Sequence, residues 1–484
     1  MPFEYTKEGN NYKYLSNGKW QLSVSNKFIS VLNPVDNSLV GKIQDVSKKE
    51  IDEVFKIAKS SQLQWQEIPV NKRAEILHKA ADLMLKNKLI IAEILMKEIA
   101  KPKSAAINEV ERTADLIKYT AEEGLRISGE IVEGQCFYKN EKRKTAFVNR
   151  VPFGVVLAIS PFNYPINLSY SKVAPALISG NSVILKPSAQ GAISVIYCAE
   201  LFLEAGLLPG VLNIVTGNSS QIGDYLVSHK DVDMVAFTGS TEIGKRISSL
   251  AVMKPLLLEL GGKDAAIILE DADLDLAVKE CISGCFSYSG QRCTAIKRII
   301  AVGNIGNKFS DKFVKEAEKL KVGKPEDNSN ICCLINKKAV DYIQELVDDA
   351  NKNGAKQLLF KTRKNNLIGP IVLDNINNKC RIYYEEQFGP VAVIIRVRDK
   401  NEAIKIVNDS EYGLQASIFT NNINDAFNIA SKLNVGTVQI NGKSDRGPDN
   451  LPFSCVKNSG LGTQGIKYSI EAMTRIKSIV LNLN

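Results

Sequence analysis

The chain has 484 residues and a mass of 53.3 kDa, which is too long for one ordinary compact core, so two or three domains are expected. Hydrophobic residues make up 44% of it and charged residues 24%, with a mean hydropathy of −0.09, which excludes a disordered chain. The net charge of +9 comes from 62 basic and 53 acidic residues scattered together, so we expect no nucleic-acid partner, and anionic small molecules are suitable ligands.

No apolar run approaches the roughly 18 residues that a membrane span needs, so no membrane partner is expected. The nine cysteines are an odd number spread thinly along the chain, and the start of the chain carries no targeting segment. These features predict free thiols and a cytoplasmic protein. Only His78 and His229 are present, and both fit structural positions, which argues against histidine-based hydrolases and zinc sites. We predict no metal site.

The predicted elements change in kind along the chain. Residues 1 to about 45 predict short strands and turns, and residues 47 to about 128 predict helices, because apolar residues recur there every 3.6 positions. Between 150 and 260, short apolar strands alternate with helical stretches, which is typical of a doubly wound parallel sheet. A second alternating set begins at residue 264 and predicts a second α/β lobe. A cleft between the lobes is therefore expected near residue 260, where open α/β folds bind ligands.

Two segments match the residue spacing of nucleotide-binding motifs, but their neighbouring residues do not fit those motifs. Residues 460–465 satisfy G-x-G-x-x-G, but no clear strand precedes them and too few residues follow for a βαβ unit. Residues 239–245 resemble a phosphate loop, but Arg246 stands where that loop needs a hydroxyl to hold magnesium. What remains is a strand that ends at Thr238 and turns into a helix, whose free N–H groups suit a dinucleotide pyrophosphate.

Five segments together resemble the aldehyde dehydrogenase superfamily. They are SPFNYP (160–165), FTGST (237–241), LELGGK (258–263), GQRCT (290–294) and EEQFGP (385–390). Their order over essentially the whole chain makes chance matching a poor explanation. The resemblance implies an α/β fold of two doubly wound lobes plus a small β bridging element. The domains it implies are an NAD(P)-binding domain at 1–128 and 150–260, a catalytic domain at 261–460, and a bridging element at 129–149 and 461–484.

Two stretches of this chain support the bridging element. Residues 131–151 fit two exposed strands that lack a partner edge, and the alternation in residues 475–484 fits a third. By the resemblance, these strands would join copies of the chain into a homotetramer.

Three residues carry the predicted chemistry. Cys293 follows an apolar helix in a flexible turn beside Arg292, where a cation favours the reactive thiolate; the resemblance implies that it is the nucleophile. Glu259 ends the apolar strand LLLEL, and the resemblance implies that it activates the water that hydrolyses a thioester. Asn163 follows the strand GVVLAIS, and the resemblance implies that its amide and the Cys293 backbone N–H form the oxyanion hole.

The resemblance also implies the cofactor site. Lys186 ends the strand NSVILK and would contact the ribose hydroxyls or a 2′-phosphate. NAD-preferring relatives often carry Glu three residues later, whereas this chain has Ala189, so we expect NADP and leave NAD open. The other expected cofactor contacts are Ser188, Gly217, Thr238, Gly239, Ser240, Gly261, Glu386 and Phe388.

The arginines predict the substrate. Arg112, Arg292 and Arg446, with Tyr164 in FNYP, resemble the non-phosphorylating glyceraldehyde-3-phosphate dehydrogenases of bacteria and plants. By that resemblance these four side chains surround a substrate phosphate, which guanidinium groups bind well. We therefore expect oxidation of D-glyceraldehyde 3-phosphate to 3-phosphoglycerate without inorganic phosphate. Another aldehyde dehydrogenase, for example one acting on succinate semialdehyde, remains the alternative because its carboxylate also suits arginines.

Overall fold

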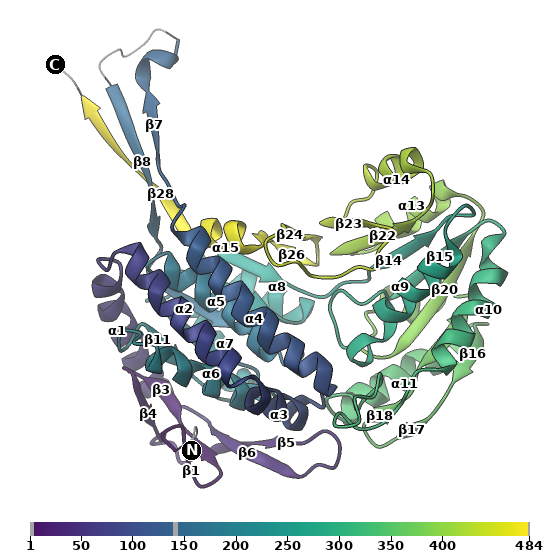
Figure 1. Cartoon of the computed structure of the whole chain (residues 1–484), viewed down its shortest axis with the longest axis horizontal. Helices are drawn as coiled ribbons and strands as arrows, with labels where there is room; N and C mark the ends of the chain where they lie inside the picture. Colours follow the sequence, from purple (N-terminus) through teal and green to yellow (C-terminus); the bar gives the residue numbers. More distant parts are fainter. Residues whose placement is uncertain (1–3, 139–143, 483–484) are drawn as a thin grey trace.

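The computed structural model of the protein describes residues 4–138 and 144–482. The chain forms two lobes, each on its own mostly parallel sheet, and a three-stranded sheet that projects from the first lobe beside the C-terminus (Figure 1). The predicted α/β class, with two alternating sets of strands and helices, is confirmed.

The first lobe is built on an eight-stranded sheet whose central strands are parallel. These central strands are almost wholly buried, because helices cover both faces of the sheet. Burial on both faces explains why their sequences are nearly continuous apolar runs. In spatial order the strands are β26 (Gly460–Leu461), β13 (Leu256–Glu259), β12 (Met234–Thr238), β9 (Val155–Ile159), β10 (Ser182–Lys186), β11 (Leu212–Ile214), β3 (Tyr14–Ser16) and β4 (Lys19–Gln21).

The helices of the first lobe follow from local signals. The first of them begins with a capping box, in which the Ser47 side chain accepts from the Glu50 N–H while the Glu50 carboxylate accepts from the Ser47 N–H. The helix that begins at Pro165 is buried along its whole length and passes between sheet and outer helices. The helices are α1 (Lys48–Trp65), α2 (Val70–Lys86), α3 (Lys88–Ile99), α4 (Lys103–Gly124), α5 (Pro165–Ile178), α6 (Ala192–Glu204), α7 (Ser219–Ser228), α8 (Thr241–Leu250) and α15 (Ile466–Ala472).

The second lobe has a seven-stranded sheet that is parallel except at one edge. Its buried residues form two apolar clusters, one on each face. In spatial order the strands are β16 (Lys356–Phe360), β19 (Ile371–Asp374), β20 (Val391–Val397), β15 (Arg298–Val302), β14 (Ala265–Ile268), β22 (Gln415–Phe419) and β23 (Thr437–Ile440). The helices are α9 (Leu274–Phe286), α10 (Ile305–Glu318), α11 (Lys337–Lys352), α12 (Arg381–Tyr384), α13 (Lys400–Asn408) and α14 (Ile423–Ala430).

Short strands complete the two lobes. A four-stranded sheet near the N-terminus has the order β1 (Lys7–Glu8), β2 (Asn11–Tyr12), β6 (Leu39–Gln44) and β5 (Phe28–Leu32). The remaining pairs are β17 (Arg363–Lys364) with β18 (Leu367–Ile368), β21 (Tyr412–Gly413) with β25 (Val456–Lys457), and β24 (Phe453–Ser454) with β27 (Thr463–Gln464).

The projecting sheet occupies the two stretches for which exposed strands were predicted. Its order is β28 (Thr474–Asn482), β8 (Lys144–Pro152) and β7 (Glu130–Glu133), all antiparallel. Residues 139–143 and 483–484 of the predicted bridging element, like residues 1–3 of the predicted NAD(P)-binding domain, lie outside the described residues. The division of the chain into domains at these boundaries stays a prediction.

The parallel strands of the first lobe bring several polar residues together at one edge of the sheet. Strands β10, β9, β12 and β13 are parallel neighbours, so their carboxyl ends lie side by side, with Thr238 paired in register with Glu259. Within the described ranges, no helix is long and apolar enough to cross a membrane. In the same residues no group of three or more His, Cys, Asp or Glu side chains is arranged to hold a metal ion.

Candidate active site

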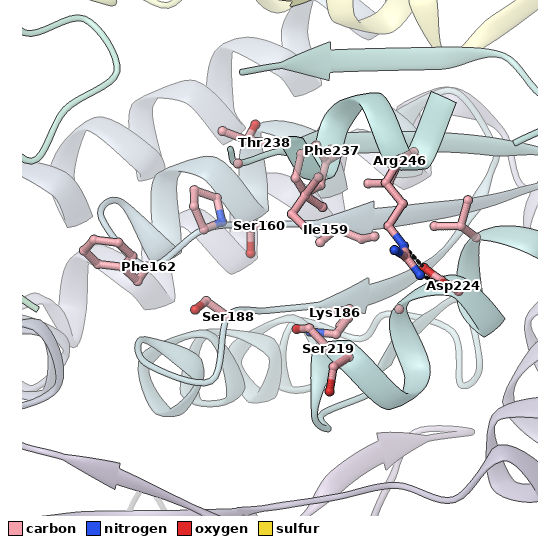
Figure 2. Close-up of a pocket in the computed structure, with 17 residues that line it drawn as sticks. Ile159, Ser160, Phe162, Lys186, Ser188, Ser219, Asp224, Phe237, Thr238 and Arg246 are labelled. Atoms are coloured by element: carbon pink, nitrogen blue, oxygen red, sulfur yellow. Dashed lines mark hydrogen bonds and ion pairs between the residues drawn. The ribbon is translucent and has the colours of Figure 1, made fainter. Parts of the chain in front are cut away.

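A cavity of about 440 Å³ lies at the carboxyl ends of the first-lobe strands. Four predicted cofactor residues line it: Lys186, Ser188, Thr238 and Gly239. Figure 2 shows Phe162 toward one side of the view, with Arg246 and Asp224 toward the other. The volume suits an organic cofactor, and the nearby N-termini of α7 and α8 offer backbone N–H groups to phosphates, so the cavity fits a dinucleotide.

Lys186 is the buried cation of this cavity. Its Nζ donates to the Ser219 hydroxyl at 2.8 Å, and burial lowers the pKa of its ammonium to about 8. Arg246 makes an ion pair with Asp224, in which its Nε lies 2.8 Å from a carboxylate oxygen. Sequence reasoning missed Ser219 and Asp224, and it used Arg246 only to reject a phosphate loop. The sequence did contain a signal for them: Ser219 begins α7, Asp224 lies within α7, and Arg246 lies within α8, and these helices follow strands of the predicted parallel sheet.

The other predicted cofactor residues lie outside the lining of this cavity. Gly217 is near Ile222 rather than at the cavity wall, and Ser240 caps α8 by accepting from the Ile243 N–H. Gly261 lies against Glu386, because a Cβ at this glycine would collide with the Glu386 carboxylate. Phe388 packs edge-on against Phe162 with ring centroids 6.0 Å apart, which places it beside one wall of the cavity.

Cys293 is held by a rigid loop between the lobes. The preceding turn, Ser287–Gly290, contains three consecutive left-handed residues, Tyr288, Ser289 and Gly290. The Ser289 hydroxyl exchanges two hydrogen bonds of 2.9 Å with the backbone of Cys332, and Gly290 packs so tightly that a Cβ would collide with the carbonyl of Gly389. Glycine is therefore required there, and the loop fixes the position of the thiol.

The expectation that Arg292 favours the thiolate is wrong for this structure. The Arg292 guanidinium turns away to donate to the carbonyl of Gly284 at 3.1 Å. Burial raises the pKa of the Cys293 thiol to about 12, and the negative charge of Glu259 adds to the rise, while Lys297 opposes it. The thiol is thus protonated at neutral pH in the absence of ligands.

Asn163 is buried and contacts the loop that carries Cys293. Its Nδ2 donates to the carbonyl of Gln291 at 3.0 Å, two residues before the thiol, and this leaves its second N–H available. Its Oδ1 is buried and has no hydrogen-bond partner among the described residues. On the backbone side, the carbonyl of Asn163 accepts from the Nζ of Lys101 at 2.9 Å.

Glu259 is buried at the end of β13 and is fully engaged. Arg446 Nη1 lies 3.0 Å from Oε1 and 2.9 Å from Oε2, and Gln464 Nε2 donates to Oε2 at 3.0 Å. Thr238 Oγ1 donates to Oε2 at 2.9 Å and in turn accepts from the Nζ of Lys172 at 2.6 Å. Burial lowers the pKa of the Lys172 ammonium to about 7.

A second cavity of about 460 Å³ brings two predicted substrate arginines together. Arg112 and Arg446 both line it, although they lie far apart in the sequence. Arg112 pairs with Asp449 through two hydrogen bonds of 2.7 and 2.8 Å. This arrangement can receive an anion between guanidinium groups.

The other two predicted substrate residues are close by but do not line this cavity. Burial raises the pKa of Tyr164 to about 12, and the charges that act on it include those of Arg292 and Arg112. Arg292 is buried, its Nη1 lies 3.5 Å from an oxygen of Asp445, and its Nε has no partner among the described residues. Asp445 itself belongs to the cavity wall.

Known proteins match this chain over nearly its whole length. The model of the aldehyde dehydrogenase family matches residues 20–479. The NADP-dependent glyceraldehyde-3-phosphate dehydrogenase of Streptococcus equinus is 52% identical over 472 residues, which cover 98% of this chain and 99% of that one. The enzyme of the same name from Pisum sativum is 45% identical over 478 residues, covering 98% and 96%. The crystal structure of the NADP-dependent glyceraldehyde-3-phosphate dehydrogenase from Bacillus halodurans C-125 complexed with NADP superposes with a TM-score of 0.97 at 48% identity, covering 98% and 100%.

Proposed function

Because the chain belongs to the aldehyde dehydrogenase family, we propose that it oxidises D-glyceraldehyde 3-phosphate to 3-phosphoglycerate with NADP and without inorganic phosphate. The relatives named above, at 45–52% identity, support this substrate and this cofactor. The observation that carries the proposal is the second cavity: Arg112 and Arg446 line it, and Arg446 contacts Glu259 directly. Cations for a substrate phosphate therefore lie beside the groups that would perform the chemistry.

The first half of the reaction forms a thioester. The Cys293 thiol gives up its proton to water, and the resulting thiolate attacks the aldehyde carbon. A C–S bond forms, and the electron pair of the carbonyl π bond moves to the oxygen, which becomes an oxyanion. The free N–H of Asn163 and the backbone N–H of Cys293 donate to that oxyanion. Lys186, Ser188 and Thr238 line the first cavity and would hold NADP, which would supply the acceptor for the hydride of the former aldehyde carbon. The acyl group then remains on Cys293 as a thioester.

The second half of the reaction is hydrolysis. Glu259 takes a proton from a water molecule, and the resulting hydroxide adds to the thioester carbonyl. The C–S bond breaks, the electron pair returns to Cys293 as the thiolate, and 3-phosphoglycerate leaves. Thr238 and Gln464 hold Glu259 by hydrogen bonds of 2.9 and 3.0 Å and orient it for this task.

The first cavity suits NADP. The Lys186 ammonium and the Ser219 hydroxyl, which are hydrogen-bonded to each other, would receive the ribose or its 2′-phosphate. Arg246 adds a second cation at the same cavity. Ala189 brings no negative charge where an acidic side chain would repel the phosphate.

The exposed apolar side chains of the projecting sheet and the free cysteines support proposals for the oligomeric state and the cellular compartment. The projecting sheet exposes apolar side chains such as Ile131, Phe147 and Ile476, which supports association of copies into a homotetramer. All nine cysteines are free, which supports a reducing compartment and hence the cytoplasm. Light scattering of the purified protein tests the assembly, because a monomer would contradict it.

The function is tested by NADPH absorbance with D-glyceraldehyde 3-phosphate and NADP in a phosphate-free buffer. We expect rapid NADPH formation that disappears in the Cys293→Ala variant. Parallel reactions use NAD as cofactor, or succinate semialdehyde as substrate. Turnover with succinate semialdehyde but not with D-glyceraldehyde 3-phosphate would agree with an aldehyde dehydrogenase reaction but would contradict the proposed substrate.

A further inference from the structure

The proposed phosphate ligand and the proposed general base form one ion pair. Arg446 Nη1 contacts both carboxylate oxygens of Glu259, at 3.0 and 2.9 Å. Both side chains are nearly buried, with 11% and 2% of their surfaces exposed. Because Nη1 donates to both oxygens of Glu259, a phosphate that binds at Nη1 must displace the carboxylate from it.

The pairing also limits Glu259 as a base. Its Oε2 accepts from three donors, namely Arg446, Thr238 and Gln464, and its Oε1 accepts from Arg446. Because a carboxylate oxygen has about two acceptor positions, Oε2 is saturated and Oε1 is directed at a cation.

We propose that the phosphate of the substrate switches on hydrolysis by taking Arg446 away from Glu259. This inference rests on the proposed function and concerns the same site. The phosphate group, with a charge of about −1.5 to −2 at neutral pH, accepts the Nη1–H of Arg446 in place of the carboxylate. Glu259 keeps its bonds to Thr238 and Gln464, gains a free Oε1, and takes the proton of the hydrolytic water there.

The neighbours of Arg446 anchor the arginine while its Nη1 turns from Glu259 to the phosphate. Its Nη2 donates to Gln464 Oε1 at 2.6 Å, and its Nε lies 3.8 Å from Asp449, so two contacts of Arg446 remain when Nη1 leaves Glu259. Asp449 also holds Arg112 through two bonds, which keeps both guanidinium groups at the wall of one cavity. The Lys172 ammonium donates to Thr238 Oγ1 at 2.6 Å, and Thr238 in turn donates to Glu259 at 2.9 Å, so Glu259 stays linked to this buried lysine.

The inference separates the two halves of the reaction. Attack by Cys293 and hydride loss do not use Glu259, so an aldehyde without a phosphate should acylate the enzyme. Hydrolysis does use Glu259, so the resulting thioester should persist. Selectivity for phosphorylated aldehydes would then come from hydrolysis as well as from binding.

The test divides the substrate into two pieces, D-glyceraldehyde and inorganic phosphite. Wild-type enzyme is mixed rapidly with D-glyceraldehyde and NADP, and the acyl adduct on Cys293 is followed by mass spectrometry while NADPH reports acylation. We expect phosphite to accelerate loss of the adduct saturably, within the roughly 10²–10⁴-fold range of a general base, and to change the acylation rate much less. Equal acceleration of both steps, or none, would overturn the inference.

Two variants in the same cavity serve as a matched pair. In Arg446→Gln, Glu259 has no cation to lose, so the adduct of D-glyceraldehyde should disappear faster than in wild type and phosphite should have no effect. In Arg112→Gln, phosphite should still accelerate loss of the adduct but at higher concentration, because Arg112 contacts Asp449 and not Glu259. A slower loss of the adduct in Arg446→Gln, or a lost acceleration in Arg112→Gln, would contradict the assigned roles.

One further measurement separates this inference from the function on which it rests. Wild-type enzyme is assayed with D-glyceraldehyde 3-phosphate and NADP. If it turns over while phosphite has no effect, the function stands and the switch is overturned. If it does not turn over, the proposed function fails and the switch fails with it.

Discussion

The buried ammonium of Lys101 donates to the backbone oxygen of Asn163 at 2.9 Å and thereby holds the residue that we propose as the oxyanion donor. Lys101 is also paired with the buried carboxylate of Glu109, and its Nζ lies 3.5 Å from the centroid of the Tyr164 ring. Glu109 in turn accepts from the first N–H groups of α5, from Ile166 at 3.0 Å. One buried ion pair therefore holds the loop between β9 and α5.

The Lys101→Met variant should lose both stability and rate. Leaving the Glu109 charge buried without its partner lowers the free energy of unfolding by about 3–5 kcal/mol, which urea denaturation measures. The NADPH burst should slow because the Asn163 backbone loses its anchor. The double variant Lys101→Met/Glu109→Gln keeps an acceptor for α5 and removes the buried charge, so it should regain most of the stability but not the burst rate. Wild-type behaviour of Lys101→Met would refute this role.

The Asn163→Ala variant should slow acylation while leaving NADP binding intact. Removal of one oxyanion donor typically lowers the rate by about 10²–10³-fold, because the remaining backbone N–H of Cys293 stabilises the oxyanion alone. Stopped-flow measurement of the NADPH burst reports the step, and fluorescence titration reports NADP affinity. An equal loss in affinity would mean that the substitution disturbs the fold of the cofactor cavity instead.

The reactivity of Cys293 without ligands should rise steeply with pH. Its thiol pKa is raised to about 12 by burial, so the thiolate is the minor form below that pH. Alkylation by iodoacetamide should therefore accelerate by roughly tenfold per pH unit from about pH 7 to about pH 10, as expected for a group well below its pKa. Peptide mass spectrometry distinguishes Cys293 from the other thiols. A plateau near neutral pH would show a thiolate that is already formed.

NADP affinity should weaken as the pH rises through about 8. Burial lowers the pKa of the Lys186 ammonium to about 8, so the free enzyme is cationic below this pH and neutral above it. A phosphate prefers the cationic form, and the dissociation constant should increase by up to tenfold per pH unit above about pH 8. The Lys186→Gln variant should bind NADP weakly with a flat profile. A wild-type profile as flat as that of the variant would rule out this titration.

The Gly290→Ala variant should disrupt the catalytic loop. Its φ of +71° disfavours a side chain, and the added Cβ would collide with the carbonyl of Gly389, so a loss of about 2–5 kcal/mol in unfolding free energy is expected. Gly354 is the matched control, since its φ is +89° and no atom lies within 4 Å of a Cβ there. Gly354→Ala should lose only about 1–2 kcal/mol. Similar melting temperatures for the two variants would contradict the collision.

The sequence places several of the proposed site residues at strand ends, and the family resemblance implies their roles. Apolar runs mark β9, β12 and β13, and the polar residues that end or follow them, such as Asn163 and Glu259, must meet where parallel strands end. The pairing of Arg446 with Glu259 was not predictable, because 187 positions separate them and only the folded lobes bring them together. The direction of the Arg292 guanidinium was not predictable either, because the side chains of adjacent residues in a turn, such as Arg292 and Cys293, can point in different directions.

One of the two edge strands of the first lobe's large sheet comes from the C-terminal part of the chain. Strand β26 pairs with β13, and α15 packs against α4 and α5, yet both are synthesised after the whole second lobe. On the ribosome, the first lobe is thus the first to emerge and the last to be completed. Gln464, which holds both Glu259 and Arg446, arrives in the same late segment. An interrupted chain that stops within the second lobe would therefore carry Cys293 without a properly held base.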